Sequence, residues 1–135
     1  MLMDSRKNIG RAGMALAIGY YGSNGWTVNI PLNDTQWYDL IIEKDGIFKT
    51  VQCKATASKN NSIEMKNCGG TKGDVYDSIL DHPLDCLFCL DKDGNMYHIP
   101  MNDLRQAGNT KSFRLRTEPT VNNQGFQTYK YVVSF

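Results

Sequence analysis

Three side chains suited to phosphate chemistry occur close together in the first half of the chain. Asp39 precedes an apolar run, and Gln52 and Lys54 alternate in the next β-prone run. Carboxylate and amide oxygens are ligands that a hard cation such as Mg²⁺ accepts. An ammonium group can stabilise negative charge that develops on a phosphate. Together these residue types predict a cation site beside a bound phosphate.

The short turn between the two runs predicts how they pair. Asp45-Gly46 separates them, and an Asp-Gly pair between β-prone segments is a strong hairpin signal. A two-residue turn places Asp39 opposite Gln52, with Cβ atoms about 5 Å apart. Because side chains alternate along a strand, Asp39, Gln52 and Lys54 then share one face of the hairpin.

Asp39 followed by Gln52-Cys53-Lys54 resembles the signature of the PD-(D/E)XK nuclease superfamily, in the variant where Gln replaces the second acid. The surrounding sequence is similar to that of small group I intron homing endonucleases, and archaeal Holliday junction resolvases are more distant relatives. The resemblance implies an α/β fold with a PD-(D/E)XK (restriction endonuclease-like) core, in one domain spanning residues 1–135. In that core an N-terminal helix packs on a mixed four- to five-stranded sheet.

The resemblance also implies a function, which is Mg²⁺-dependent hydrolysis of phosphodiester bonds in double-stranded DNA. Asp39, Gln52 and the Cys53 carbonyl would surround the metal, and Lys54 would serve the nucleophile. A structure-specific nuclease of the junction-resolvase type is the alternative within the same enzyme class.

Position 14 departs from the family pattern. A first helix is expected over residues 4–21, and it contains Gly10-Arg11-Ala12-Gly13. The resemblance implies a metal-binding Glu directly afterwards, but the next residue is Met14, whose thioether is a poor ligand for a hard cation. Met14 can equally be an ordinary packing residue. If it replaces an acid, the site is weakened or inactive, which leaves a catalytically silent DNA-binding domain as an alternative. The predicted apolar stripe of the helix consists of Ile9, Gly13, Leu16 and Tyr20.

The charge of the chain is close to neutral. It has 15 Lys and Arg against 14 Asp and Glu, a formal net charge of +1, whereas nucleic-acid-binding domains are commonly more basic. Clustering on one face can still create a phosphate-binding surface, and the near-neutral balance otherwise favours an interaction module that binds no nucleic acid. The candidate phosphate contacts are Arg6, Lys7, Arg11, Lys59, Lys66, Lys72, Arg114 and Arg116. A sequence-specific cut needs more contact than a 15.2 kDa chain offers, so a homodimer or homotetramer is expected.

The remaining elements are predicted from apolar alternation and turn residues. We expect strands at 26–30, 63–66, 86–91, 96–99, 113–116 and 129–133, and a short helix at 102–106. Cys86-x-x-Cys89 has no second pair at zinc-ribbon spacing, so a buried strand is favoured over a zinc site. The glycine-rich segment 69–73 is either a loop that folds over DNA or a solvated loop. No run is apolar enough to cross a membrane and no signal-peptide pattern is present, so we expect a cytoplasmic (intracellular) protein.

Overall fold

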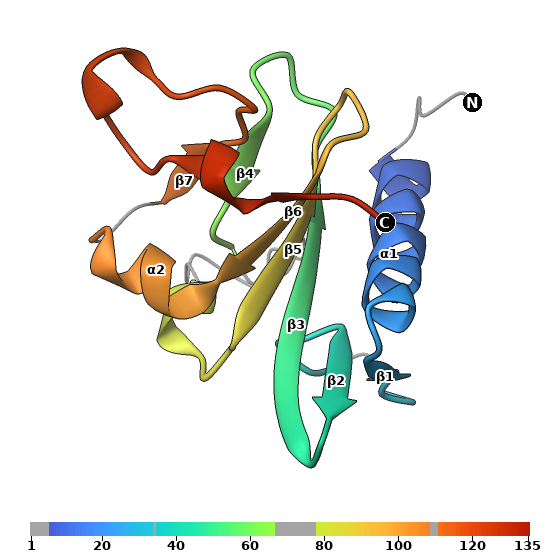
Figure 1. Cartoon of the computed structure of the whole chain (residues 1–135). Helices are drawn as coiled ribbons and strands as arrows, with labels where there is room; N and C mark the ends of the chain where they lie inside the picture. Colours follow the sequence, from blue (N-terminus) through green and yellow to red (C-terminus); the bar gives the residue numbers. More distant parts are fainter. Residues whose placement is uncertain (1–5, 34, 67–77, 109–110) are drawn as a thin grey trace.

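A long N-terminal helix lies along one face of a twisted sheet (Figure 1). The computed structural model describes residues 6–33, 35–66, 78–108 and 111–135. Helix α1 spans Arg6–Ser23, close to the predicted 4–21, and the segment 69–73 lies outside the described residues. Within the described ranges, no helix is long and apolar enough to span a membrane.

The main sheet has six strands in the order β1-β2-β3-β5-β6-β8. Only the β3–β5 pair is parallel among these neighbours, so the predicted mixed α/β sheet is confirmed. The predicted number of four to five strands is too low, because short strands extend both edges. The strands are β1 (Thr27–Asn29), β2 (Leu40–Lys44), β3 (Ile47–Ala55), β5 (Cys86–Leu90), β6 (Met96–Pro100) and β8 (Val132–Val133).

The last strand is shorter than predicted. Residues Thr128–Tyr131 form a 3₁₀ turn, η3, and only Val132–Val133 pair with β6. The Tyr131 hydroxyl donates to the Asp103 carboxylate at 2.7 Å, and its ring stacks on Phe126. These contacts hold Tyr131 away from the sheet. They involve residues elsewhere in the chain, so local β-propensity could not predict them.

The β2–β3 hairpin has the predicted register. Ile41 pairs with Thr50, and Lys44 pairs with Ile47 across the turn. Asp45 and Gly46 both have positive φ, 53° and 79°. That combination is typical of the type I′ turn, whose twist matches that of the flanking strands.

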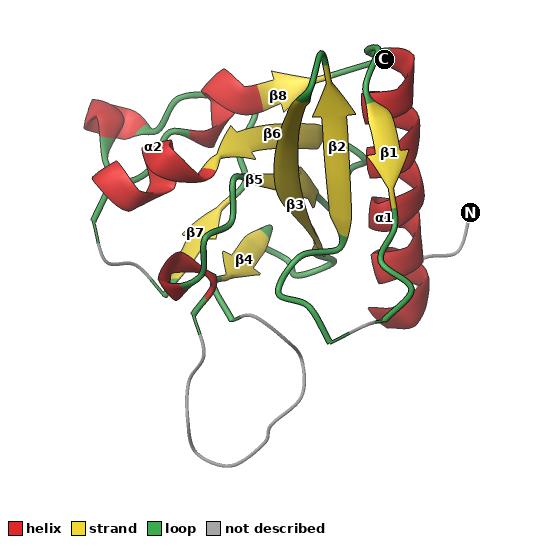
Figure 2. Cartoon of the chain, turned by 90° about the horizontal axis from the view of Figure 1, so that it is seen from below, coloured by secondary structure: helices red, strands yellow, loops and turns green. Residues whose placement is uncertain are grey.

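The two faces of the sheet are covered differently (Figure 2). On one face α1 packs against a cluster that includes Leu40, Val51 and Phe88. On the other face Leu87, Cys89 and Ile99 belong to a second cluster. That cluster includes residues of β4 (Ser62–Glu64), β7 (Ser112–Arg114) and α2 (Met101–Gln106). Strands β4 and β7 pair as a separate two-stranded sheet.

The buried stripe of α1 consists of Ile9, Gly13, Ala17 and Tyr21. These positions are spaced by four residues throughout, so the second half of the stripe is one position later than predicted. A Cβ at Gly13 would lie 3.2 Å from the Ala55 Cβ. This position therefore needs a residue that lets the helix approach the sheet closely.

The cysteines of β5 have structural environments. Cys86 belongs to the α1-face cluster and Cys89 to the opposite cluster, and both are buried. Two thiols on opposite faces of a strand cannot bind one ion, so the interpretation of this segment as a buried strand is confirmed.

Asp91 at the end of β5 allows a first prediction, on stability. Asp91 is 2% exposed, and its carboxylate accepts hydrogen bonds from the Asn95 N–H at 2.9 Å and the Tyr97 hydroxyl at 2.8 Å. Asp91→Ala leaves the fully buried Tyr97 hydroxyl without this acceptor. We expect the free energy of unfolding to fall by about 3 kcal/mol in urea denaturation. Asp93→Ala, at an exposed position of the same turn, is the control, and equal losses in the two variants would contradict this role.

Candidate functional site

Asp39 lies where β2 separates from β3. Its N–H donates to the Val51 carbonyl at 2.8 Å, although Val51 is the register partner of Leu40. Two consecutive residues that face one partner residue form a β-bulge, which redirects a side chain. The Asp39 carboxylate consequently accepts the Cys53 N–H at 2.8 Å through Oδ2. Asp39 is therefore not directly opposite Gln52 as predicted. Its N–H bonds to Val51, and its carboxylate bonds to the backbone of Cys53.

Gln52 is buried on the face of β3 that α1 does not cover. It pairs with Leu87, is 9% exposed, and makes no side-chain hydrogen bond to the described residues. Buried amides usually have hydrogen-bond partners. The amide oxygen of Gln52 is thus free to accept an interaction from a ligand or from water.

Lys54 lies two residues after Gln52 on β3, and its side chain is therefore on the same face of the sheet. Its Nζ donates to the carbonyl of Lys66, just beyond β4, which holds the ammonium group near the end of that strand. Lys54 and Lys66 line a cavity of about 630 Å³, together with the exposed carboxylate of Glu64. Sequence reasoning did not single out Glu64. Its position one residue after buried Ile63, in the strand that follows the hairpin, is the signal that could have found it.

The environment of Asp39 disfavours an isolated negative charge. Burial raises the pKa of its carboxyl group above the ordinary value, while the Cys53 N–H and the Lys54 ammonium oppose this shift. A cation at the carboxylate would favour the charged form in the same way. Burial also raises the pKa of the Cys53 thiol, so its carbonyl oxygen is the better ligand for a hard cation.

The available donors fit Mg²⁺, but they carry little charge. Asp39, Gln52 and the Cys53 carbonyl offer oxygen atoms, which hard cations prefer. No group of three His, Cys, Asp or Glu side chains suited to a metal exists within the described part of the chain. A cation here would therefore depend on one carboxylate, on retained water and on substrate phosphate.

Met14 approaches this region from the other side of the sheet. It is half-buried and packs, as Cys53 does, against the cluster on the α1 face, whereas Gln52 and Lys54 lie on the opposite face. The metal-binding Glu that the family resemblance implies at this position would have to lie near both Asp39 and Gln52, but position 14 is not on the Gln52 side of the sheet. A side chain at position 14 lies on the side of Cys53, whose N–H contacts Asp39, and away from the Gln52 amide.

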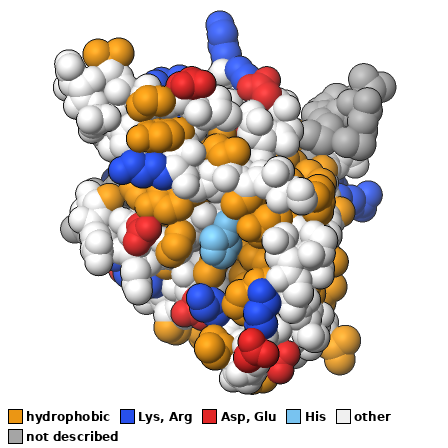
Figure 3. Space-filling view, viewed as in Figure 1, with side chains coloured by type: hydrophobic (Ala, Val, Ile, Leu, Met, Phe, Trp, Pro, Cys, Tyr) orange, Lys and Arg blue, Asp and Glu red, His pale blue; other side chains and the backbone are white. Residues whose placement is uncertain are grey.

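The predicted phosphate contacts fall into separate groups. Lys7 and Arg11 are exposed on α1, whereas Lys59, Arg114 and Arg116 line a cavity of about 340 Å³ with Lys92. Arg114 Nε donates to the Asn60 carbonyl at 3.0 Å, which joins β7 to the β3–β4 loop. On the face drawn in Figure 3, acidic and hydrophobic side chains separate the basic ones. The side chain of Arg6 and all of Lys72 lie outside the described residues.

Comparisons with known proteins identify the family and agree with the fold. Residues 4–131 match the family model of the PD-(D/E)XK endonucleases. Among solved structures, the bacterial homing endonuclease I-Ssp6803I is similar in fold, with a TM-score of 0.73 and 21% sequence identity. That similarity covers 95% of this chain and 88% of that one. No curated protein matches the chain at a significant level.

Proposed function

This chain belongs to the PD-(D/E)XK endonuclease family, and from that premise we propose that it cuts double-stranded DNA by Mg²⁺-dependent hydrolysis. The observation that supports the proposal is the arrangement at one end of β3. There the Asp39 carboxylate accepts the Cys53 N–H, and the Lys54 ammonium opposes the rise in the pKa of Asp39. The Gln52 amide makes no side-chain hydrogen bond to a described residue, and Lys54 lines a cavity.

Each residue has a distinct role in this proposal. Asp39, Gln52 and the Cys53 carbonyl hold Mg²⁺, which when bound supplies positive charge to the phosphate. The Cys53 N–H fixes the Asp39 carboxylate, so that its second oxygen can face a ligand. Lys54 orients the attacking water and stabilises the charge that develops on phosphorus. The bond to the Lys66 carbonyl restricts where that ammonium group can lie.

We further propose that the cut is sequence-specific and of the homing type, made by a homodimer or homotetramer. The fold likeness to a homing endonuclease supports the first part. The small size of the chain supports the second, because a specific protein–DNA interface needs a large surface. The competing function is that of a catalytically silent DNA-binding domain, and Met14 is the observation that favours it.

A cleavage assay tests the proposal directly. The full chain is incubated with linear duplex DNA and with a four-way junction, with and without Mg²⁺. We expect duplex cleavage only with Mg²⁺. Junction cleavage alone would favour a resolvase-like activity, and binding without cleavage would favour the silent domain. If the chain neither binds nor cuts DNA, the remaining interpretation is an interaction module that uses this fold without nucleic acid.

The mode of DNA binding gives a second prediction. Because the net charge is only +1, affinity must come from clustered basic residues and should fall steeply with added salt. Replacing Arg114 and Arg116 by Ala should reduce the slope of log affinity against log salt by about two. Filter binding across a salt series measures the slope.

Two further variants make this result interpretable. Lys59→Ala with Lys66→Ala tests one lysine from the cavity of Arg114 and Arg116 and one from the cavity of Lys54. Lys130→Ala, an exposed lysine of η3, serves as the control and should leave the slope unchanged. An affinity that does not depend on salt would contradict the phosphate contacts.

A further inference from the structure

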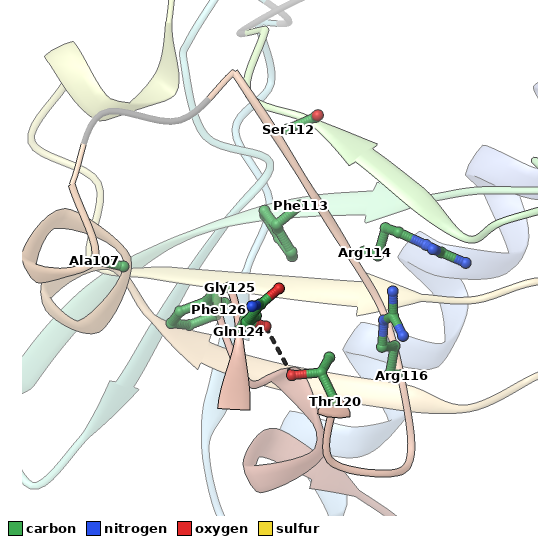
Figure 4. A pocket seen from close by; sticks show the side chains of 9 residues that line it. All are labelled: Ala107, Ser112, Phe113, Arg114, Arg116, Thr120, Gln124, Gly125 and Phe126. Carbon is green, nitrogen blue, oxygen red and sulfur yellow. Dashed lines mark hydrogen bonds between the residues drawn. The ribbon is translucent and has the colours of Figure 1, made fainter. Parts of the chain in front are cut away.

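The loop that precedes η3 has a backbone fixed by its own side chains. We call residues 120–125 the β7–η3 loop. The Gln127 amide accepts the Thr120 N–H at 3.1 Å and donates to the carbonyls of Gln124 at 2.9 Å and Gly125 at 3.1 Å. The Thr120 hydroxyl also donates to the Gln124 carbonyl at 2.7 Å (Figure 4). One amide and one hydroxyl thus close the loop on itself.

This framework presents a row of uncommitted side chains. Asn122 and Asn123 have φ of 60° and 51°, a left-handed conformation that Asn tolerates better than most residues. Val121 is 83% exposed, and Asn122, Asn123 and Gln124 are exposed as well. None of these three side-chain amides hydrogen-bonds to a described residue. The loop therefore offers three amides and one apolar side chain to a partner.

Cationic groups lie at the base of the loop. A cavity of about 540 Å³ beneath it is lined by Phe113, Arg114, Arg116 and Phe126, among others. Both guanidinium groups lie at the same end of this cavity (Figure 4). Arg114 and Arg116 also line the neighbouring cavity with Lys59 and Lys92. Asp91, Asp93 and Glu118 line it too, so basic side chains outnumber acidic ones from the loop towards the β3–β4 loop. This charge is complementary to a phosphate backbone.

The exposed side chains match one kind of base pair. The amide of Asn or Gln donates to and accepts from the adenine edge in the major groove, and an apolar side chain can contact the thymine methyl group. Contacts of arginine with phosphates set the position of the protein but carry no sequence information. We propose that Val121, Asn122, Asn123 and Gln124 read A·T base pairs in the major groove of a duplex whose backbone is held by Arg114 and Arg116. This inference rests on the proposed function, because it assumes that the bound partner is duplex DNA.

The test compares sequence selection by the full chain and by a double variant. Asn122→Gly with Asn123→Gly removes both amides, and glycine adopts positive φ without strain, so the loop backbone is kept. Duplexes are selected by binding from a randomised pool in Ca²⁺, and cleaved molecules are sequenced separately after addition of Mg²⁺. The double variant should lose A·T preference at the contacted positions by roughly ten- to a hundredfold. The salt dependence of its binding should stay that of the parent.

Two controls separate base reading from loop structure. Asp45→Gly introduces glycine at another exposed position of positive φ, 53°, in the hairpin turn and away from the loop, and should keep the parent's sequence profile. The parent protein is also tested on selected duplexes that carry 7-deazaadenine, which lacks N7, or deoxyuridine, which lacks the thymine methyl group. Both should weaken binding at the same positions, and this measurement needs no variant to fold.

The outcomes distinguish the two proposals. If the parent cuts duplex DNA but the double variant keeps its A·T preference, the loop does not read bases and the proposed nuclease function stands. Selection without any base preference, or insensitivity to both modified bases, also overturns the inference alone. A parent that neither binds nor cuts any duplex overturns the proposed function, and the inference falls with it.

Discussion

Asp39→Asn should reduce Mg²⁺-dependent cleavage by roughly a thousandfold or more, while fold and duplex binding stay largely intact. Asn keeps an oxygen that can accept the Cys53 N–H at the bulge, so the local backbone has no reason to change. What disappears is the carboxylate charge that the proposed cation site depends on. Single-turnover cleavage of one duplex, measured over a range of Mg²⁺ concentrations, gives the rate and the metal requirement.

The stability of this variant provides an independent check. Burial raises the pKa of Asp39 in the folded chain, so the stabilisation associated with its protonated form is present at low pH. It is lost as the pH rises through the folded-state pKa. Asn cannot ionise, so without metal the variant should be at least as stable as the parent at neutral pH. Asp45→Asn, at the exposed hairpin turn, is the control and should cut like the parent. Equal cleavage by Asp39→Asn and the parent would remove Asp39 from the proposed site.

The hairpin could be predicted from sequence because its determinants are local. Asp45-Gly46 specifies the turn, and the alternation of the flanking residues specifies which side chains share a face. The β-bulge at Asp39 could not be predicted in this way. It depends on how β2 leaves the sheet at Leu40, and no nearby residue type marks it.

The errors at Met14 and at the last strand have a common cause in long-range packing. Residue spacing identifies the buried stripe of a helix, but it does not say which face of a sheet the helix covers. That depends on the parallel β3–β5 pairing, which joins residues more than thirty positions apart. Likewise, the contacts of Tyr131 with Phe126 and Asp103 end the final strand early. Short sequence patterns and a family resemblance were enough to predict the fold class. They were not enough to predict from which face of the sheet each side chain approaches the site.

Met14→Glu should raise Mg²⁺-dependent cleavage well above that of the chain as it stands, by roughly ten- to a hundredfold. Asp39 and Gln52 together supply a single negative charge, which is little to hold a divalent cation against its hydration shell. Met14 and Cys53 both pack against the cluster on the α1 face, and the Cys53 N–H donates to the Asp39 carboxylate. We therefore expect a Glu at position 14 to add a second charged oxygen ligand, from the α1 face of the sheet.

Met14→Gln is the matched control, because it has nearly the same shape as Glu and lacks the charge. Cleavage rates of the parent and both variants are compared on the same duplex at matched Mg²⁺, together with the Mg²⁺ concentration for half-maximal rate. We expect a gain for Glu alone, with a lower Mg²⁺ requirement. Without metal, Met14→Glu should be slightly less stable than Met14→Gln, because two carboxylates are brought near each other. If Glu and Gln give the same rate as Met, position 14 is a packing site, and α1 contributes to the fold and not to the chemistry.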